Sequence, residues 1–424
     1  MKEKRIAFGT LGCRLNQFES DSLVSGFVKN GYEIVSINDK ADVYIVNTCS
    51  VTNKSDAKSR NLLHRVHRLN PDALLFVTGC YAETESETVK NIDGVNFVIG
   101  NDKKYDLFNI VHRTLSHSPV DIKKVPSNRF HYEPAENTLH TRSYLKIQDG
   151  CDEHCSYCKI PRARGRGESR PSRDIIHTTQ HLIDFGYKEI MLTGINIGDY
   201  MDEETNLSSL LKTLLAISGD FRIHLSSLEP NKVTPSILDL LSHPKICPHL
   251  HLPLQSGSDR ILGLMGRGYD RKDYLNVVKS LRERLPMINI TTDVMVGFPS
   301  ESEEDFMQTL TLVEDLSITH THTFKYSMRD GTPASKLKDQ IPEFIKSERS
   351  LRIRQLSEGL NQTYREGFKD RFVRVLTEKA LGEGIYAGYT DHYIRVQFMA
   401  RNPVIGEFKK LKIMDVTKEK TWAC

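Results

Sequence analysis

The feature that most constrains the fold is an alternation of short apolar runs with amphipathic segments of about 10 to 15 residues, which occurs twice along the chain. Such alternation predicts parallel strands joined by crossover helices. In residues 1–115 the apolar runs KRIAFGTLG, YEIVSI, ADVYIVNT, ALLFVTG and NFVIG surround helical patterns at 16–29 and 53–69. This part of the chain is therefore predicted to form a Rossmann-like domain with a parallel sheet.

Residues 143–366 contain the second alternation, which has six strand-and-helix units. The expected strands read SYLKIQD, EIMLTGI, RIHLSSL, HLHLPLQ, INITTDVMVGF and THTFKYS, and the helices between them begin near Ser172, Leu207, Thr234, Asp270 and Ser302. A closed barrel of this α/β type needs eight units. Six units predict an open, partial (β/α)6 barrel with its working face at the carboxyl ends of the strands.

The remaining segments have simpler patterns. Residues 116–142 are polar, contain three prolines and show no clear period, as expected of a linker. A charged, helix-like stretch at 341–369 is expected to brace the barrel. Residues 367–424 hold short strand patterns separated by Gly, Asn and Asp, which predict a small C-terminal antiparallel β-barrel of the OB type.

Composition is ordinary for a globular protein, with 38% hydrophobic and 27% charged residues. No apolar run approaches the ~20 residues that cross a bilayer, and the start lacks a secretory signal pattern, so we expect a soluble, cytoplasmic protein without a membrane partner. Residues 367–424 hold 11 Lys and Arg against seven Asp and Glu, whereas the preceding 366 residues balance at 47 against 48. A basic tail on a near-neutral body indicates either a grip on a polyanion or a solvated basic surface.

Cys151, Cys155 and Cys158 form a C-x3-C-x2-C triplet directly after the first expected barrel strand, and therefore at the working face. In a reducing cytosol, closely spaced cysteines indicate a metal or catalytic site. A closed zinc site takes four ligands, and no fourth cysteine lies nearby in the sequence. A 4Fe–4S cluster on three thiolates leaves one iron open to an amine and a carboxylate, which S-adenosylmethionine offers. Zinc or unrelated thiols are the alternatives.

Cys13, Cys49 and Cys80 each follow an expected strand of the N-terminal sheet, in TLGC, VNTC and VTGC. The carboxyl ends of parallel strands meet at one edge of a sheet, so these thiols could converge on one point. The alternative is three buried core cysteines, a common fate of free Cys. Cys247, in PKICPHL, is expected to pack in the core, and Cys424, the last residue, is expected to be mobile.

Eight motifs stand out: TLGCRLNQFES, VNTCSV, VTGCY, DGCDEHCSYCKIPRARG, LTGINIG, SSLEP, HLPLQSGSDRIL and DVMVGFP. Together they resemble the radical S-adenosylmethionine methylthiotransferases, and the resemblance covers nearly the whole chain. It implies an N-terminal cluster domain, a radical domain and a C-terminal TRAM domain in the three parts described above. The chain departs from the family pattern at Gly266, where Asn is usual, and at Ser300 and Ser302, where Gly and Thr are usual.

The resemblance implies an enzyme with two 4Fe–4S clusters and bound S-adenosylmethionine. The cysteine triplet would hold the cluster that cleaves S-adenosylmethionine to a radical, and the three N-terminal cysteines would hold the cluster that carries the sulfur. A radical suits attack on an aromatic C–H, and a cofactor must supply it. Contacts to S-adenosylmethionine or substrate are expected from Tyr157, Gly194, Glu229, Gln255 and Gly297. For the last four, a structural role near a strand end is the alternative.

The segment KIPRARGRGESRPSR, beside the cluster loop, holds six basic residues and one acid. Arg162, Arg164 and Arg166 are expected to contact the phosphates of a polynucleotide, and the alternative is a solvated loop. Arg395 and Arg401, which lie among aromatic residues of the tail, are expected to add to this RNA interface.

The family divides by substrate. The phrases LKIQDGC, CKIPRARG and LTGINIG most resemble the branch that methylthiolates C2 of N6-threonylcarbamoyladenosine at tRNA position 37. The alternatives are isopentenyl-adenosine in tRNA, a ribosomal-protein aspartate and, in a different class, an iron–sulfur RNA-binding regulator. The resemblance also implies tRNA as a partner, an electron donor such as flavodoxin or ferredoxin, and a sulfur source.

Overall fold

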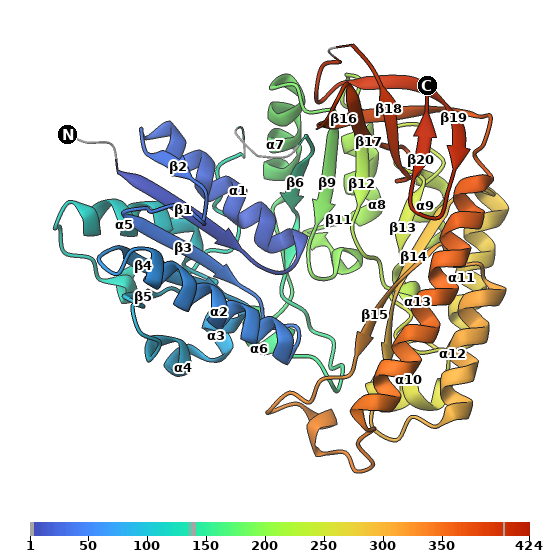
Figure 1. Ribbon diagram of the computed structural model, residues 1–424, viewed down its shortest axis with the longest axis horizontal. Helices are drawn as coiled ribbons and strands as arrows, with labels where there is room; N and C mark the ends of the chain where they lie inside the picture. The colour runs from blue at the N-terminus through green and yellow to red at the C-terminus, as the bar shows by residue number, and fades with distance from the viewer. Residues whose placement is uncertain (1–3, 135, 137–140, 402) are drawn as a thin grey trace.

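The structure, a computed structural model, describes residues 4–134, 136, 141–401 and 403–424, so part of the expected linker 116–142 lies outside the described residues. The N-terminal part forms a five-stranded sheet in the order β2-β1-β3-β4-β5, in which every pairing is parallel, as the sequence predicts (Figure 1). Its strands are β1 (Arg5–Thr10), β2 (Glu33–Val35), β3 (Val43–Thr48), β4 (Leu74–Gly79) and β5 (Phe97–Val98).

Helices cover both faces of this sheet because its strands are apolar on both sides. On β3, Val43 and Ile45 pack against one helical layer, whereas Tyr44 and Val46 pack against the other. The first layer consists of α1 (Arg14–Lys29) and α5 (Leu107–Leu115), with the 3-10 turn η1 (Lys104–Asp106). The second consists of α2 (Asn53–Leu69), α3 (Cys80–Thr84) and α4 (Ser86–Lys90). The predicted Rossmann-like layering is confirmed.

Six parallel strands form the central half-barrel: β6 (Ser143–Lys146), β9 (Glu189–Thr193), β12 (Arg222–Leu225), β13 (His249–His251), β14 (Asn289–Val296) and β15 (His320–Lys325). Isolated bridges, such as that between Ser227 and His251, join the β12 and β13 halves. Among the described residues, no pairing joins β15 back to β6. The predicted open, partial barrel is therefore confirmed.

The outer helices begin close to the expected residues. Thr234, Asp270 and Ser302 are N-caps, and the side-chain oxygen of each accepts a hydrogen bond from a backbone N–H. Because such capping residues mark helix starts, these three starts could be predicted from the sequence. These helices are α7 (Ser172–Asp184), α8 (Leu207–Leu215), α9 (Pro235–Leu240), α11 (Arg271–Arg284) and α12 (Glu303–Asp315), and the two short helices α6 (Ile160–Arg164) and α10 (Asp259–Met265) were not expected. Minor elements are β7 (Gln148–Asp149), β8 (Glu168–Ser169), β10 (Met201–Asp202), β11 (Thr205–Asn206), η2 (Ile122–Lys124), η3 (Ile197–Asp199), η4 (Pro230–Lys232) and η5 (Pro333–Lys336).

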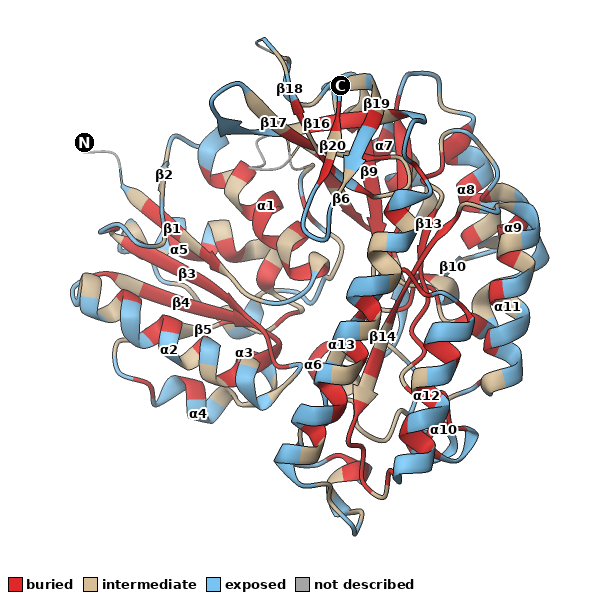
Figure 2. Cartoon of the chain, turned by 45° about the vertical axis from the view of Figure 1, so that its right-hand side comes forward, coloured by how far each residue is buried: buried red, intermediate tan, exposed pale blue. Residues whose placement is uncertain are grey.

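The helix α13 (Glu343–Glu366) braces the half-barrel, as expected. It lies along the edge strand β15, where the Thr321 N–H donates to Ser357 Oγ at 2.9 Å. At its end, Arg365 donates to Thr421 Oγ1 at 3.0 Å and so reaches the C-terminal part of the chain. Figure 2 shows the buried side of α13 turned toward the strands.

The C-terminal strands close into a barrel in the order β16-β17-β18-β20-β19, which confirms the small barrel. Its strands are β16 (Phe372–Gly382), β17 (Ile385–Thr390), β18 (Arg395–Met399), β19 (Phe408–Val416) and β20 (Thr421–Ala423). The three-residue β20 was not expected, and it pairs parallel with β18, so the fully antiparallel prediction is wrong for that pair. The expectation of a mobile Cys424 is also corrected, because its backbone exchanges two hydrogen bonds with Lys412.

This C-terminal barrel covers the amino-terminal end of the half-barrel (Figure 1). The turn between β17 and β18 brings the Tyr393 ring to 4.4 Å from His224 and 5.0 Å from His249. Asp391 of the same turn pairs at 2.8 Å with Arg222, whose side chain is fully buried. The carboxyl end is thereby left as the accessible working end. None of the helices formed by the described residues has the length and apolar character needed to span a membrane.

Candidate active site

The three N-terminal cysteines come together because they follow three adjacent strands. Cys13 is the N-cap of α1 after β1, Cys49 follows β3, and Cys80 begins α3 directly after β4. A Cβ placed on Gly12 would lie 2.9 Å from Cys49 Sγ, so the loops that carry Cys13 and Cys49 touch. The structure thus brings the expected cysteines to one edge of the sheet.

The chemistry of these thiols fits a metal cluster. Burial raises the pKa of Cys49 to about 11, and neighbouring Cys80 and Cys13 add to that effect. Burial also raises the pKa of Cys80. Such thiols stay protonated until a metal displaces the protons. No three His, Cys, Asp or Glu side chains in the described part of the chain converge as tightly as a single ion requires. A cubic cluster instead takes each thiolate at a separate corner.

The triplet lies on the loop after β7. The Cys151 N–H donates to the Gly165 carbonyl at 3.2 Å, which folds the loop back on itself. The Glu153 and Ile160 N–H groups point at Cys151 Sγ and Cys158 Sγ, both at 3.4 Å, and such donors suit a thiolate. Burial raises the pKa of Cys151 to about 11 and that of Cys158 to about 12. These thiols also need a metal to deprotonate.

One pocket joins the two sets of cysteines. Cys80 lines it from the N-terminal sheet, and Cys158 lines it from the triplet loop. The carboxyl ends of the last strands of the half-barrel supply the far wall. Further lining residues are Tyr157, Gln255, Asp293, Met295, Phe324 and Arg329. Two of the five residues expected to contact a cofactor, Tyr157 and Gln255, therefore stand at this pocket.

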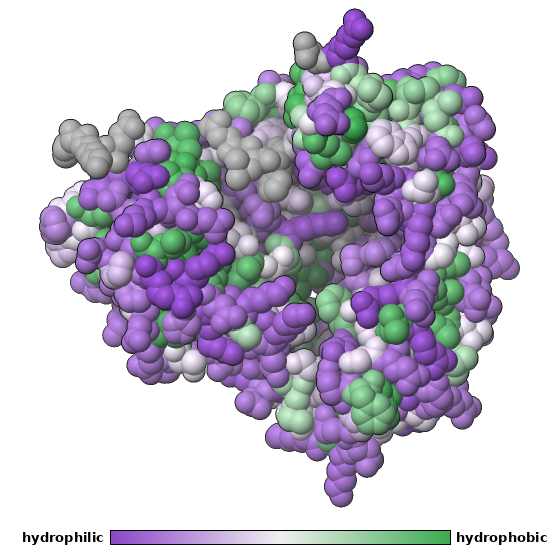
Figure 3. Space-filling view, in the orientation of Figure 1, coloured by the Kyte–Doolittle hydropathy of each residue, from purple (hydrophilic) through white to green (hydrophobic). Residues whose placement is uncertain are grey.

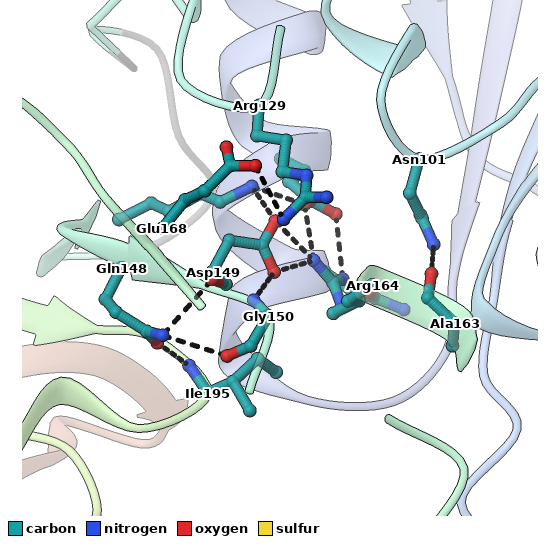
Figure 4. A network of polar contacts seen from close by, with 12 residues as sticks. Asn101, Arg129, Gln148, Asp149, Gly150, Ala163, Arg164, Glu168 and Ile195 are labelled. Atoms are coloured by element: carbon teal, nitrogen blue, oxygen red, sulfur yellow. Dashed lines mark hydrogen bonds and ion pairs between the residues drawn. The ribbon is translucent and has the colours of Figure 1, made fainter. Parts of the chain in front are cut away.

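Two other expected cofactor residues are engaged by the protein itself. A Cβ on Gly194 would lie 2.9 Å from the Gln148 carbonyl, and the next N–H, that of Ile195, donates to Gln148 Oε1 (Figure 4). Gly297 has φ +70°, and a Cβ there would lie 2.3 Å from Lys346 of α13. The close approach that each glycine allows is thus to protein atoms, which is the structural role weighed for both.

Arg267 is a site residue that the sequence reasoning missed. It donates to Cys155 Sγ at 3.2 Å and to the Tyr157 hydroxyl at 3.5 Å. It also pairs with Glu229, the remaining expected cofactor residue, which is thereby fixed beside the triplet. The sequence motif that could have indicated Arg267 is MGRGY, in which Arg267 directly follows the C-cap of α10. That C-cap, Gly266, adopts the left-handed conformation.

The departures from the family pattern have local explanations. Gly266 has φ +71°, a conformation that both Gly and Asn tolerate. Ser302 caps α12 through its hydroxyl, which a Thr can do equally. Ser300 has φ +67°, so a serine here carries backbone strain that a glycine avoids.

Arg164 does not face solvent, so its assignment to RNA binding is corrected. Its side chain is fully buried and donates to Asp149 Oδ1 and Glu19 Oε1, both at 3.0 Å, and to Asn16 at 2.6 Å (Figure 4). Glu19 and Asn16 lie on α1, which packs on the N-terminal sheet, whereas Arg164 ends α6, the helix that follows the triplet. Arg164 therefore joins the N-terminal part of the chain to the half-barrel.

Two lysines complete this buried network. Lys104 Nζ lies 2.5 Å from Glu19, and Lys146 Nζ lies 3.1 Å from Glu19 and 2.5 Å from Asp149. Burial alone would raise the pKa of Glu19, but the cations outweigh it and hold that pKa well below its usual range. Three cations face two carboxylates, so the network keeps a net positive charge. Arg164 and Lys104 also oppose the burial effect on the Cys80 pKa, which places that charge near the N-terminal thiols.

Arg329 forms a second link between the same two parts. It follows β15 and is 4% exposed. It donates to Asp56 and to Asn53 at 2.7 Å each, and to Ser50 Oγ at 2.6 Å. Ser50 is the residue after Cys49, so Arg329 ties the loop of that cysteine to the half-barrel. No local pattern in the sequence marks it.

The other four expected RNA contacts lie on the surface. Arg162 and Arg166 are exposed on the segment after the triplet, where Arg166 pairs with Asp152 at 3.1 Å. Arg395 and Arg401 are exposed on the C-terminal barrel. Cys247 is buried, as expected.

Two family models match the chain. The model described as "Uncharacterized protein family UPF0004" matches residues 5–100, and that of the "Radical SAM superfamily" matches residues 145–313. Two relatives are named threonylcarbamoyladenosine tRNA methylthiotransferase MtaB. The one from Bacillus subtilis is 37% identical over 96% of this chain and 93% of its own, and the one from Aquifex aeolicus is 41% identical over 88% and 92%. A Staphylococcus aureus relative named tRNA-2-methylthio-N(6)-dimethylallyladenosine synthase is 33% identical over 97% and 83%.

Among solved structures, the radical S-adenosylmethionine methyltransferase TsrM from Kitasatospora setae superposes with a TM-score of 0.57. It is 15% identical, and the match covers 78% of this chain and 77% of that one, which supports the fold. The relatives and the two matched models cover nearly all of the parts described above. The chain belongs to the radical S-adenosylmethionine methylthiotransferases of the MtaB type.

Proposed function

We propose that the chain transfers a methylthio group to C2 of N6-threonylcarbamoyladenosine at position 37 of tRNA. The observation that carries the proposal is the pocket at which one cysteine of each set stands, in a chain that aligns almost end to end with relatives named for that activity. The second candidate is the isopentenyl-type base, because a relative named for dimethylallyladenosine also aligns with nearly the whole chain.

The family works with two 4Fe–4S clusters and S-adenosylmethionine. We assign Cys151, Cys155 and Cys158 to one cluster, and the three N-terminal cysteines Cys13, Cys49 and Cys80 to the other. When bound, these groups supply a carbon-centred radical and an activated sulfur, which side chains cannot provide. S-adenosylmethionine would lie against Tyr157 and Gln255 in the shared pocket.

The chain's own residues hold this arrangement in place. Arg267 fixes the sulfur of Cys155 and the ring of Tyr157 from one side. Arg164 and Arg329 fix the N-terminal sheet against the half-barrel, so the distance between the two sets of cysteines is set by buried charge pairs. Positioning of this kind is effective because small displacements of reacting groups cost large factors in rate.

The basic surface would hold the tRNA. Arg162 and Arg166 beside the pocket, and Arg395 and Arg401 on the C-terminal barrel, are exposed and would contact phosphates, for which Arg166 would give up its surface pair with Asp152. That barrel would act as a TRAM domain. A tRNA substrate supports a cytoplasmic location. The reductant, of the flavodoxin or ferredoxin kind, and the sulfur source would be separate partners.

Replacing Gly150 by Ala is expected to lose the iron held by the triplet. Gly150 has φ +72°, and a Cβ there would lie 1.9 Å from the Arg166 carbonyl, so the loop that carries Cys151 must shift. Gly31→Ala is the matched control, because Gly31 has φ +78° but open space around it. Iron and sulfide per chain after anaerobic reconstitution are the readout. Equal iron content in both variants would show that the clash at Gly150 does not displace the loop that carries Cys151.

The substrate is tested on cellular tRNA. Deletion of the gene is expected to remove 2-methylthio-N6-threonylcarbamoyladenosine from the digested nucleosides and to leave its precursor without the methylthio group. Nucleoside mass spectrometry reports both. Accumulation of the isopentenyl precursor instead would favour the second candidate. An unchanged tRNA profile would contradict both, and failure of the purified, reduced protein to release 5′-deoxyadenosine would favour the RNA-binding regulator.

A further inference from the structure

The half-barrel carries polar side chains on its inside, and Figure 3 shows a hollow between it and the N-terminal part, lined mainly by hydrophilic side chains. A row of polar contacts runs there from the amino-terminal end of the strands to the pocket. We call it the histidine row, and its members in order are Glu189, His224, His249, Thr291, His251 and Asp293. The first five are at most 9% exposed, whereas the last lines the pocket. The row therefore links a buried carboxylate to the wall of the active site.

The buried end of the row fixes the direction of its hydrogen bonds. Burial alone would raise the pKa of Glu189, but Arg222 and Arg142 hold it well below its usual range, so Glu189 is an ionised acceptor. Burial lowers the pKa of His224 to about 4, so its ring is neutral at pH 7 and has one N–H. That N–H is on Nδ1, which lies 3.4 Å from Glu189 Oε1, and Nε2 is left as an acceptor.

The same direction continues along the row. His249 Nδ1 lies 2.7 Å from His224 Nε2 and must donate to it. Burial lowers the pKa of His249 well below its usual range, so this ring is also neutral and its Nε2 accepts. The Thr291 hydroxyl, 3.3 Å away, donates to this nitrogen and accepts from His251 Nδ1 at 2.9 Å. Because buried polar atoms are hydrogen-bonded, the row places a hydrogen on Nδ1 of His251.

This direction produces a conflict at the pocket. A neutral His251 with its hydrogen on Nδ1 turns the lone pair of Nε2 toward Asp293 Oδ2, which lies 3.4 Å away. A lone pair and a carboxylate repel each other, and one additional proton between the two atoms removes the repulsion. That proton makes His251 an imidazolium or Asp293 a carboxylic acid. His251 and Asp293 thus form a proton-sharing pair at the wall of the pocket.

The other titratable side chains around the proton-sharing pair have their own states. The ring of His322 lies 5.8 Å from that of His251. Burial lowers the pKa of His320, and it lowers the pKa of His322 to about 4, so both rings of β15 are neutral at pH 7. Glu229 is paired with Arg267, and the Tyr274 hydroxyl donates to a backbone carbonyl. The additional proton therefore belongs to the pair itself.

We propose that His251 and Asp293 donate their shared proton in a hydrogen bond to a ring nitrogen of the substrate adenine, either N1 or N3. This inference rests on the proposed function and deepens it, because it names the group that orients the base. C2 of adenine lies between N1 and N3, and both nitrogens carry a lone pair and no hydrogen. A C2 held between Cys80 and Cys158 brings one of them to the wall that contains Asp293. A bare carboxylate there would repel the base, whereas the proton-sharing pair attracts it.

Nitrogen NMR of the isotope-labelled histidine rings in the reconstituted holoenzyme tests the proton. His251 is expected to carry a hydrogen on Nδ1, and His224 and His249 are expected to carry theirs on Nδ1 only. Thr291→Val keeps the shape of the side chain but removes the hydroxyl that accepts from His251. In this variant the hydrogen of His251 is expected to move to Nε2, where it can donate to a bare Asp293 carboxylate. The inference is wrong if wild-type His251 carries its hydrogen only on Nε2, or if Thr291→Val leaves its signals unchanged.

Thr321→Val is the matched control. Thr321 is a buried threonine of the neighbouring strand β15, and its hydroxyl has no hydrogen-bond partner among the described residues. It alternates with His320 and His322 along the strand and so points to the other face. Its replacement is expected to leave the ring signals of the histidine row as they are in the wild type.

The contact with the base is tested by the binding of three anticodon stem-loops to the holoenzyme. One carries N6-threonylcarbamoyladenosine, and the other two carry analogues in which C–H replaces N1 or N3. One analogue is expected to bind the wild-type protein about tenfold more weakly, the effect of one lost hydrogen bond, and Thr291→Val is expected to lose this difference. Equal binding of all three by the wild type, or the same difference in Thr291→Val, would overturn the contact. Turnover of the natural stem-loop, measured separately, tests the proposed function itself.

Discussion

Replacing Cys80 by Ala is expected to remove about half of the bound iron and to abolish methylthio transfer, while the release of 5′-deoxyadenosine continues. Cys80 directly follows β4 and lines the shared pocket. Its replacement removes one of the three proposed ligands of the N-terminal cluster and leaves the three cysteines of the triplet in place. Cys158→Ala is expected to remove the other half of the iron and to stop 5′-deoxyadenosine release. Iron content, the electron paramagnetic resonance signal of the reduced protein and the two products separate these results.

Cys247→Ala is the control for both variants. Cys247 is a buried cysteine, like Cys80, but it lies before β13 at the amino-terminal end of the half-barrel. Its removal is expected to leave the iron content unchanged. If Cys80→Ala kept all of its iron, or if it stopped 5′-deoxyadenosine release as completely as Cys158→Ala, the division of work between the two cysteine sets would be wrong.

Replacing Arg164 by Leu is expected to loosen the N-terminal sheet from the half-barrel, with a loss of about 1–3 kcal/mol at that interface. Lys104 and Lys146 still balance the two carboxylates, but Glu19, Asp149 and Asn16 each lose a buried hydrogen bond from the guanidinium. Hydrogen exchange of the amides in α1 and β6 measures the interface directly. It is preferable to a single melting curve, because a chain with several cores need not unfold in one step.

Arg166→Leu is the matched control. Arg166 lies two residues further on, but its side chain is 89% exposed and, among the residues that the structure describes, its ion pair is with the exposed Asp152. Such a surface pair contributes about 0–1 kcal/mol, so exchange in α1 should not change. Equal protection of α1 in the two variants would show that the buried network does not hold the interface. A selective loss in Arg164→Leu with reduced methylthio transfer would connect the interface to catalysis.

Much of the fold could be predicted because local signals agree with it. Thr234, Asp270 and Ser302 are capping residues at the helix starts that were expected, and apolar runs mark all the long strands. Strand β20 has only three residues, and its pairing with β18 depends on barrel closure, which no local pattern encodes. Cys424 was misjudged for the same reason, since Lys412 holds it only once the barrel has formed.

The site was predictable where the chemistry is local. The triplet and the cysteines at three strand ends follow from spacing and topology. Arg164 was misassigned because the count of charges along a basic segment does not include Glu19, which is 145 residues away in the sequence and accepts a hydrogen bond from Arg164. The contact of Arg329 with Ser50, 279 residues away, could not be predicted for the same reason. Long-range ion pairs of this kind emerge only when the folded parts are placed together.

The docking of the C-terminal barrel onto the half-barrel has a consequence for how a base is chosen. Asp391 and Tyr393 enter the amino-terminal end of the half-barrel, where Arg222 and Arg142 hold them through buried contacts. A barrel anchored in this way keeps a constant span to the pocket at the opposite end of the strands. An RNA held on its surface, as proposed above, would present only the nucleotide that lies at that span. On that proposal the molecule would select a position along the anticodon loop by distance, before any group on the base is recognised.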